Sequence, residues 1–248
     1  GQFDPYAEVP GFDLPAGAIA GALERLMQWD FTFTRDRPEP LLYTVWLREL
    51  QTALYGDELG PEFMGRDGVG QPERIEQMLL RSPRWCDEVT TGDRAETCAD
   101  IVARALAAAL TQLRDAHGED MDAWRWGAAN VAPLAHQVLG NVPLIGGGFR
   151  MPQEIAGSSF TLNRAGARIN RGLEFSVGHG AGYRAVYDLA NPENSRFMIA
   201  TGQSGNPFSR HWDDLAALWS AGRHIPITAP GEAAEQFTLR PQPLPNAL

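Results

Sequence analysis

The segment Gly202-Gln-Ser-Gly-Asn206 is the part of the sequence whose residue types come nearest to a nucleophilic site. In the nucleophile elbow of many hydrolases, a serine has glycine two positions before it and two positions after it, and a helix follows directly. Gly202 satisfies the first requirement, but Asn206 stands where the second glycine is needed. The residues at 206–209 favour a loop over an immediate helix. We therefore predict that Ser204 is not a nucleophile and that the segment is architectural.

The histidines do not predict a metal site. No two of them are four residues apart, the spacing that places two imidazoles on one helical face. Only His211 has acidic neighbours at ligand spacing, Asp213 and Asp214, and we interpret these as first-turn residues of a helix that Ser209 caps. The five histidines are His117, His136, His179, His211 and His224.

The two cysteines, Cys86 and Cys98, have no neighbouring histidine cluster and cannot build a closed zinc site. Their spacing suits a local disulfide, which would contribute roughly 3 kcal/mol on the chain-entropy estimate and would imply an oxidising compartment. Two unrelated buried thiols are the alternative.

Several other chemistries are excluded. The chain has no lysine, so it cannot contain a lysine Schiff base or a Ser–Lys dyad. The run Gly146-Gly-Gly148 lacks the residues of a phosphate-binding loop and is predicted to be a flexible connection. The formal charge of −10 argues against nucleic acid or anionic lipid as a partner. No apolar run reaches the roughly 18 residues that a membrane span requires.

The first half of the chain is predicted to be mostly helical, because its apolar residues recur with helical spacing. Thr97 is expected to cap the longest of these helices. The expected helices cover Ala18–Gln28, Pro38–Tyr55, Arg74–Leu80 and Cys98–Ala116.

The second half carries β-forming runs at Phe160–Leu162, Gly182–Leu189 and Phe197–Thr201. Gly202 and Gly205 are expected to take conformations that a side chain would resist. A last helix should begin after Ser209, bury Trp212, Leu215 and Trp219, and stop at Gly222. The chain therefore reads as α+β, with a mostly helical part at 1–130, a strand-rich part with one final helix at 131–239 and a Pro-rich tail at 240–248.

The segment Ile199–Gly222 closely resembles the C-terminal signature of the penicillin amidase family. It departs from that signature at Asn206, Arg210, Trp212 and Leu215, where the family has His, Pro, Tyr and Gln. Four further blocks resemble the family and occur in its order, so the resemblance spans nearly the whole chain. They are Gln28–Asp30, Trp85–Cys98, Trp124–Gly127 and Tyr183–Leu189.

The resemblance implies an N-terminal-nucleophile hydrolase with a four-layer αββα sandwich, of which this chain is the C-terminal portion. In it, the helical part is expected to cover the sheet and wall the acyl pocket, and the strand-rich part to complete the sandwich. Family members are cut from a precursor, and the large chain begins with a serine whose own α-amino group is the general base. Residue 1 here is Gly, so the nucleophile and the oxyanion-hole donors are expected upstream. The family's Ca²⁺ ligands are expected there as well, and we expect no cofactor in this chain. Its partner would be the remainder of the precursor, in the periplasm or outside the cell.

One catalytic candidate lies within the chain. The cephalosporin-acylase branch resembles a triad in which an acidic residue, on the strand before the Gly-Gln-Ser turn, orients an upstream histidine. Asp188 occupies the equivalent place. The alternative is a strand-end carboxylate that faces solvent or pairs with Arg184.

The substrate implied by the resemblance is an N-acylated amine: a β-lactam, an acyl-homoserine lactone or a lipopeptide. The rival hypothesis is a non-catalytic binding or structural domain that retains the family's architecture.

Overall fold

A computed structural model describes residues 9–64, 71–92, 95–167, 172–173 and 175–227, and the Pro-rich tail at 240–248 lies outside this range. The helical half contains four main helices at the predicted places, but the second continues past its predicted end at Tyr55 to Met64. They are α1 (Ala18–Gln28), α2 (Glu39–Met64, bent at Gly60), α3 (Pro72–Arg81) and α4 (Cys98–His117). Thr97 caps α4 in a capping box with Asp100, as predicted. None of the described helices is long and apolar enough to cross a membrane.

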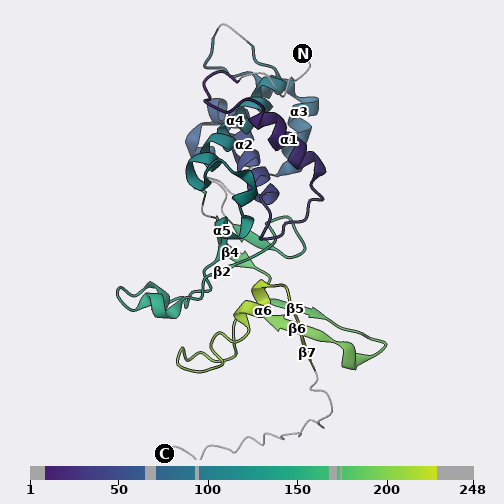
Figure 1. Cartoon of the computed structure of the whole chain (residues 1–248), viewed down its shortest axis with the longest axis vertical. Coiled ribbons are helices and arrows are strands. Elements are labelled where there is room, and N and C mark those ends of the chain that lie inside the picture. Colours follow the sequence, from purple (N-terminus) through teal and green to yellow (C-terminus); the bar gives the residue numbers. More distant parts are fainter. Residues whose placement is uncertain (1–8, 65–70, 93–94, 168–171, 174, 228–248) are drawn as a thin grey trace, which may run out of the picture.

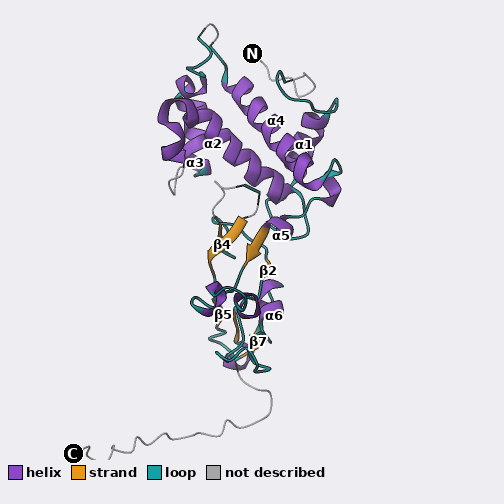
Figure 2. Ribbon diagram, turned by 90° about the vertical axis from the view of Figure 1, so that its left-hand side faces the viewer, coloured by secondary structure: helices purple, strands orange, loops and turns teal. Residues whose placement is uncertain are grey.

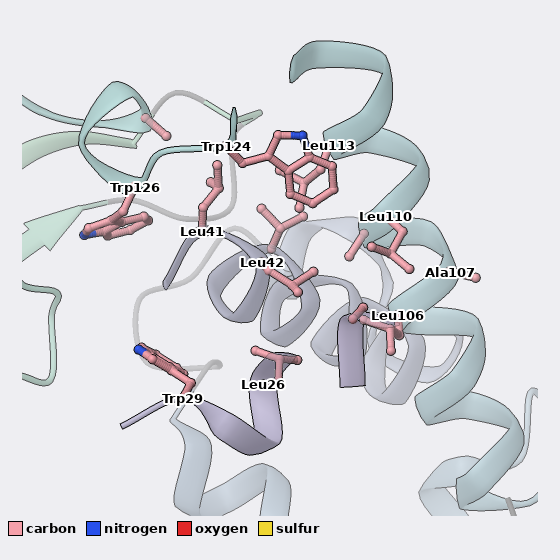
Figure 3. Packing of buried hydrophobic residues seen from close by; sticks show 14 of the residues in the cluster. Leu26, Trp29, Leu41, Leu42, Leu106, Ala107, Leu110, Leu113, Trp124 and Trp126 are labelled. Atoms are coloured by element: carbon pink, nitrogen blue, oxygen red, sulfur yellow. The ribbon is translucent and has the colours of Figure 1, made fainter. Parts of the chain in front are cut away.

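The main core lies where α1, α2 and α4 meet the segment that leads into the sheets (Figure 3). Leu41 and Leu42 from α2 face Leu106 and Leu110 from α4, and all four side chains are essentially buried. Each such leucine contributes about 1.5–3 kcal/mol when its surface leaves water. Trp124 and Trp126 close this core on the side of the sheets (Figure 3).

The strand-rich half holds two small sheets below the helices (Figures 1 and 2). The first has the order β2-β1-β4-β3, in which β1 runs parallel to β4 and the other pairs are antiparallel. It follows the short helix α5 (Trp126–Ala129). Its strands are β1 (Asn130–Ala132), β2 (Gln153–Glu154), β3 (Ala165–Ala167) and β4 (Phe175–Gly180).

The second sheet is antiparallel with the order β5-β6-β7, and α6 (Ala216–Ser220) packs on it. Its strands are β5 (Tyr183–Val186), β6 (Arg196–Ile199) and β7 (Ile225–Pro226). β5 and β6 lie inside the predicted runs to within one residue. The α+β order, helical first and strand-rich second, is confirmed.

Two predicted elements differ from the structure. Phe160–Leu162 is a turn and not a strand, because the Thr161 side chain bonds the backbone of Ser158 and Asn163 and closes the loop on itself. The last helix begins at Ala216 and not after Ser209. Its expected first turn is diverted because the carbonyls of His211 and Trp212 accept hydrogen bonds from Ser204 and Gly202 instead.

Two expectations about glycines are also wrong. Gly205 has a negative φ and open space around its Cα, so it supplies no conformation that a side chain would resist. The Gly146-Gly-Gly148 run is part of a 3-10 turn at Gly146–Phe149 and is not a loose connection. A Cβ on Gly146 would lie 2.5 Å from the carbonyl oxygen of Gly140, so the backbone is closely packed there, whereas Gly147 and Gly148 have open space around them.

Cys86 and Cys98 are joined by a disulfide in the structure, with 4.9 Å between their Cα atoms. Cys86 ends a 3-10 turn behind α3, and Cys98 is the first residue of α4. The bridge therefore ties the start of α4 to the α3 region.

Candidate functional site

The Gly-Gln-Ser-Gly segment forms a closed turn after β6. The Gly202 N–H donates to the Trp212 carbonyl at 3.0 Å, and the Ser204 N–H donates to the His211 carbonyl at 2.9 Å. A Cβ on Gly202 would lie 2.0 Å from the His211 carbonyl oxygen, closer than atoms can approach. Glycine is therefore required at 202 by the close approach of two backbone segments.

This turn brings together a serine, a histidine and an aspartate, but their hydrogen bonds do not connect them as a nucleophile, a base and an orienting acid. His211 Nδ1 lies 2.8 Å from Asp214 Oδ2, which orients the imidazole. The other nitrogen, Nε2, accepts a hydrogen bond from Arg210 Nε at 3.0 Å. The Ser204 hydroxyl oxygen accepts the Asn206 N–H at 3.1 Å. Because Nε2 is occupied by a cationic donor, His211 is not placed to take a proton from Ser204.

The pairing of His211 with Asp214 was not predicted. Asp214 was predicted to be a first-turn residue of a helix, but the residues before Ala216 form turns. Ser209 likewise caps no helix, since its hydroxyl oxygen accepts the N–H of His211 within the turn. The three-residue spacing of His211 and Asp214 is the sequence feature from which this pairing could have been predicted.

Asp188 lies just beyond β5, in the loop that leads to β6. Its Oδ1 accepts the N–H groups of Ala190 and Asn191, and its Oδ2 accepts the Asn194 side-chain amide at 3.1 Å. The backbone hydrogen bond from Asn191 and the side-chain bond from Asn194 lower the pKa of the Asp188 carboxyl. Asp188 is therefore an ionised turn-forming residue.

Arg184 does not pair with Asp188. Its guanidinium donates to the carbonyl oxygens of Ala181 and Trp219, and it stacks 4.8 Å above the Trp219 ring. The charge of Arg184 therefore supports the packing of α6 on the sheet.

The tryptophan blocks of the sequence also have architectural roles. Each indole N–H donates to a backbone carbonyl: Trp29 to Thr32, Trp124 to Gly118, and Trp126 to Gly157. Gly127 is required because a Cβ there would lie 2.8 Å from Arg35 Cβ. These blocks anchor the linker between the helices and the first sheet.

A concave apolar pocket lies between α2 and α3, with a volume of about 310 Å³. Its walls are aromatic and aliphatic, with a single charged residue, Glu76. The lining residues are Tyr43, Trp46, Leu47 and Leu50 from α2, and Pro72, Ile75, Glu76, Leu79 and Leu80 from α3.

Within the described residues, no three His, Cys, Asp or Glu side chains are grouped so that they could hold a metal ion.

Comparisons with known proteins agree with the resemblance. The family model described as Penicillin amidase matches residues 3–236. The chain is 31% identical to an acyl-homoserine lactone acylase QuiP of Pseudomonas syringae pv. syringae, over 89% of this chain and 28% of the relative. It is 32% identical to QuiP of Pseudomonas syringae pv. tomato, over 83% of this chain and 26% of the relative. The chain thus spans about a quarter of the length of these curated relatives.

Among solved structures, a thermostable penicillin G acylase from Alcaligenes faecalis is similar to this chain, with a TM-score of 0.46 and 15% sequence identity. The matched region covers 95% of this chain and 45% of that chain.

Proposed function

The chain belongs to the penicillin amidase family, and we propose that it is the C-terminal part of an amidohydrolase that cleaves the acyl group from an N-acylated amine. In this proposal an N-terminal serine upstream is the nucleophile, and its own α-amino group is the base. The oxyanion-hole donors lie upstream as well. The present chain supplies architecture around that active site.

The hydrogen bonding of Ser204 and of the neighbouring His211 is the observation that carries this assignment. Its hydroxyl accepts a backbone N–H, and the nearest histidine of its turn bonds Arg210 and Asp214. A serine of this kind lacks the activated hydroxyl that acyl transfer requires. The chemistry of the family is therefore assigned to residues outside this chain.

The β5-β6-β7 sheet has an uncovered apolar face, which favours the presence of an upstream segment that packs on it. Met198, on the face that α6 covers, is fully buried. The opposite face carries Tyr183, Ala185, Phe197 and Ile199, which belong to paired positions of β5 and β6, and none of them is buried. An apolar sheet face that the chain itself leaves uncovered is typical of a surface that packs against another layer. In the proposed enzyme, the upstream part covers this second face and completes the sandwich.

The relatives named acyl-homoserine lactone acylase make an acyl-homoserine lactone the first substrate to test. β-Lactam and lipopeptide amides are the other members of the same class. The calcium ion and the processing site would belong to the upstream part. The disulfide supports maturation in an oxidising compartment, which we propose is the periplasm or the exterior of the cell.

Asp188 retains one role in this proposal. Oδ2 accepts a hydrogen bond from Asn194, which leaves a lone pair for an imidazole N–H from the upstream part. An orienting acid of this kind fixes the tautomer of a catalytic histidine. In the longer enzyme, Asp188→Asn would then lower kcat strongly, whereas a turn-forming role alone would lower only stability.

Two assays test the proposed function. The 248-residue chain should hydrolyse no acyl-homoserine lactone and no phenylacetyl, glutaryl or long-chain acyl chromogenic amide. A chimera in which this chain replaces the matched quarter of the Pseudomonas syringae relative should release the acyl group. Turnover by the isolated chain that disappears in Ser204→Ala would refute the upstream assignment. A folded, processed chimera without turnover would favour the rival non-catalytic domain.

A further inference from the structure

We infer that the pocket between α2 and α3 binds the alkyl chain of an amphiphile whose head group is neutral or cationic. This inference is independent of the proposed amidase chemistry. The pocket lies between two helices of the helical half, whereas the turn of Ser204 and the loop of Asp188 belong to the strand-rich half. Figure 1 shows α2 and α3 in the upper part of the molecule, away from β5, β6 and β7.

The walls of the pocket suit an unbranched hydrocarbon chain. α2 contributes Leu47 and Leu50, both more than nine-tenths buried, and α3 contributes Ile75, which is 3% exposed. Leu80, at 73% exposure, leaves the pocket open to a ligand. A volume of about 310 Å³ lies at the lower end of the range of small-molecule sites. Burial of each CH₂ group in such walls is favourable, so affinity should increase with chain length.

The charges of α3 select the head group. Glu76 lines the pocket, and Glu73, one helical turn earlier, lies on the same side. The negative charge of Glu73 reaches the wall itself, because burial first and this charge second raise the pKa of Tyr43. Arg74 and Arg81 lie on the stripe of Met78, which does not line the pocket. The mouth is therefore acidic, which repels a carboxylate and admits a neutral or cationic head.

The test compares probes that share one ten-carbon chain: decyltrimethylammonium, decyl maltoside and sodium decanoate. Each is titrated into the 248-residue chain below its micelle concentration, at low salt, by isothermal titration calorimetry. We expect saturable binding of the cationic and neutral probes, with decanoate at least tenfold weaker. The corresponding eight-carbon probes should bind more weakly than the ten-carbon ones.

Matched variants locate the site. Leu79→Gln should weaken binding of decyl maltoside by about tenfold, whereas Met78→Gln should not. Both residues are half-buried on α3, and only Leu79 lines the pocket. Glu76→Arg should reduce the preference for the cationic probe over decanoate by at least threefold at low salt. Glu24→Arg makes the same change of net charge at an exposed site on α1 and should leave that preference unchanged.

The inference is overturned if no probe binds saturably, if decanoate binds as well as the cationic probe, or if Met78→Gln and Leu79→Gln weaken binding equally. None of these outcomes bears on the amidase assay, which measures turnover.

Discussion

Gly202 is the residue at which the turn after β6 tolerates no side chain. In Gly202→Ala the new methyl group would meet the His211 carbonyl at 2.0 Å and Asp214 Oδ1 at 2.5 Å, so the two backbone segments must separate. We expect a loss of about 3 kcal/mol in the free energy of unfolding. The matched control is Gly205→Ala in the same motif, where nothing lies within 4 Å and a change of less than about 0.5 kcal/mol is expected. Urea unfolding of both variants decides, and equal losses would contradict the close-approach argument.

The raised pKa of Glu58 predicts that stability depends on pH. Partial burial raises the pKa of its carboxyl, and the hydrogen bond and charge of Asp57 raise it further, to about 7 from 4.5. An acid whose pKa is raised in the folded chain contributes stability below pH 4.5 that is lost as the pH rises through 7. Burial raises the pKa of Asp57, but hydrogen bonds from Glu58 and the Val89 N–H outweigh it and lower this pKa. The contribution of Asp57 to the free energy of unfolding therefore changes only in more acidic solution.

We therefore expect Glu58→Gln to flatten the fall in unfolding free energy between pH 5 and pH 8. Urea unfolding at intervals across this range measures the slope for the parent chain and the variant. Glu24→Gln, at an exposed site on α1, is the control and should leave the slope as it is. An unchanged slope in Glu58→Gln would show that the carboxyl does not retain its proton in the folded chain.

Among the elements, those whose signal is local could be predicted from the sequence. α4 carries its own cap at Thr97 and an apolar stripe through Leu106 and Leu113, so its bounds are correct to within one residue. β1 and β2 could not be predicted, because each has only two or three residues and exists through its partners. Val131 pairs with Glu154 in one direction and with Ser176 in the other, contacts that no local pattern encodes. The last helix was placed too early for the same reason, since its diverted carbonyls bond residues 202 and 204.

The disulfide is the element-scale link with the largest expected effect, because it closes a loop of 12 residues between the turn behind α3 and the start of α4. Reduction should lower the free energy of unfolding by about 3 kcal/mol. Thermal melting with and without dithiothreitol measures this, and non-reducing peptide mapping establishes the bridge. The variant with both Cys86→Ala and Cys98→Ala should be insensitive to dithiothreitol. Free thiols in protein from an oxidising compartment would refute both the bridge and the proposed location.

At the scale of the whole molecule, the two halves differ in how completely they are packed. The helical half surrounds a core with α1, α2 and α4, whereas the second sheet has α6 on one face only (Figures 1 and 3). The strands there and the burial of Trp219, which is 3% exposed, could be predicted from the sequence, whereas Trp212 and Leu215, also predicted to be buried, are only half-buried. The sheet face that this chain covers itself could not be predicted, because Met198 and Ile199 are equally apolar neighbours.

This difference gives a matched pair of substitutions in adjacent residues of β6. Met198 is fully buried beneath α6, so Met198→Asp places a charge in the core and should cost more than about 4 kcal/mol. Ile199 points to the opposite face, where Ile199→Asp should cost about 1 kcal/mol and reduce the binding of a hydrophobic dye by the isolated chain. In the chimera with the Pseudomonas syringae relative, Ile199→Asp should block assembly and turnover, although the isolated variant folds. Urea unfolding, dye fluorescence and chimera activity measure the three effects. If Ile199→Asp unfolds the isolated chain as severely as Met198→Asp, then the face is packed within this chain and no upstream segment is needed to cover it.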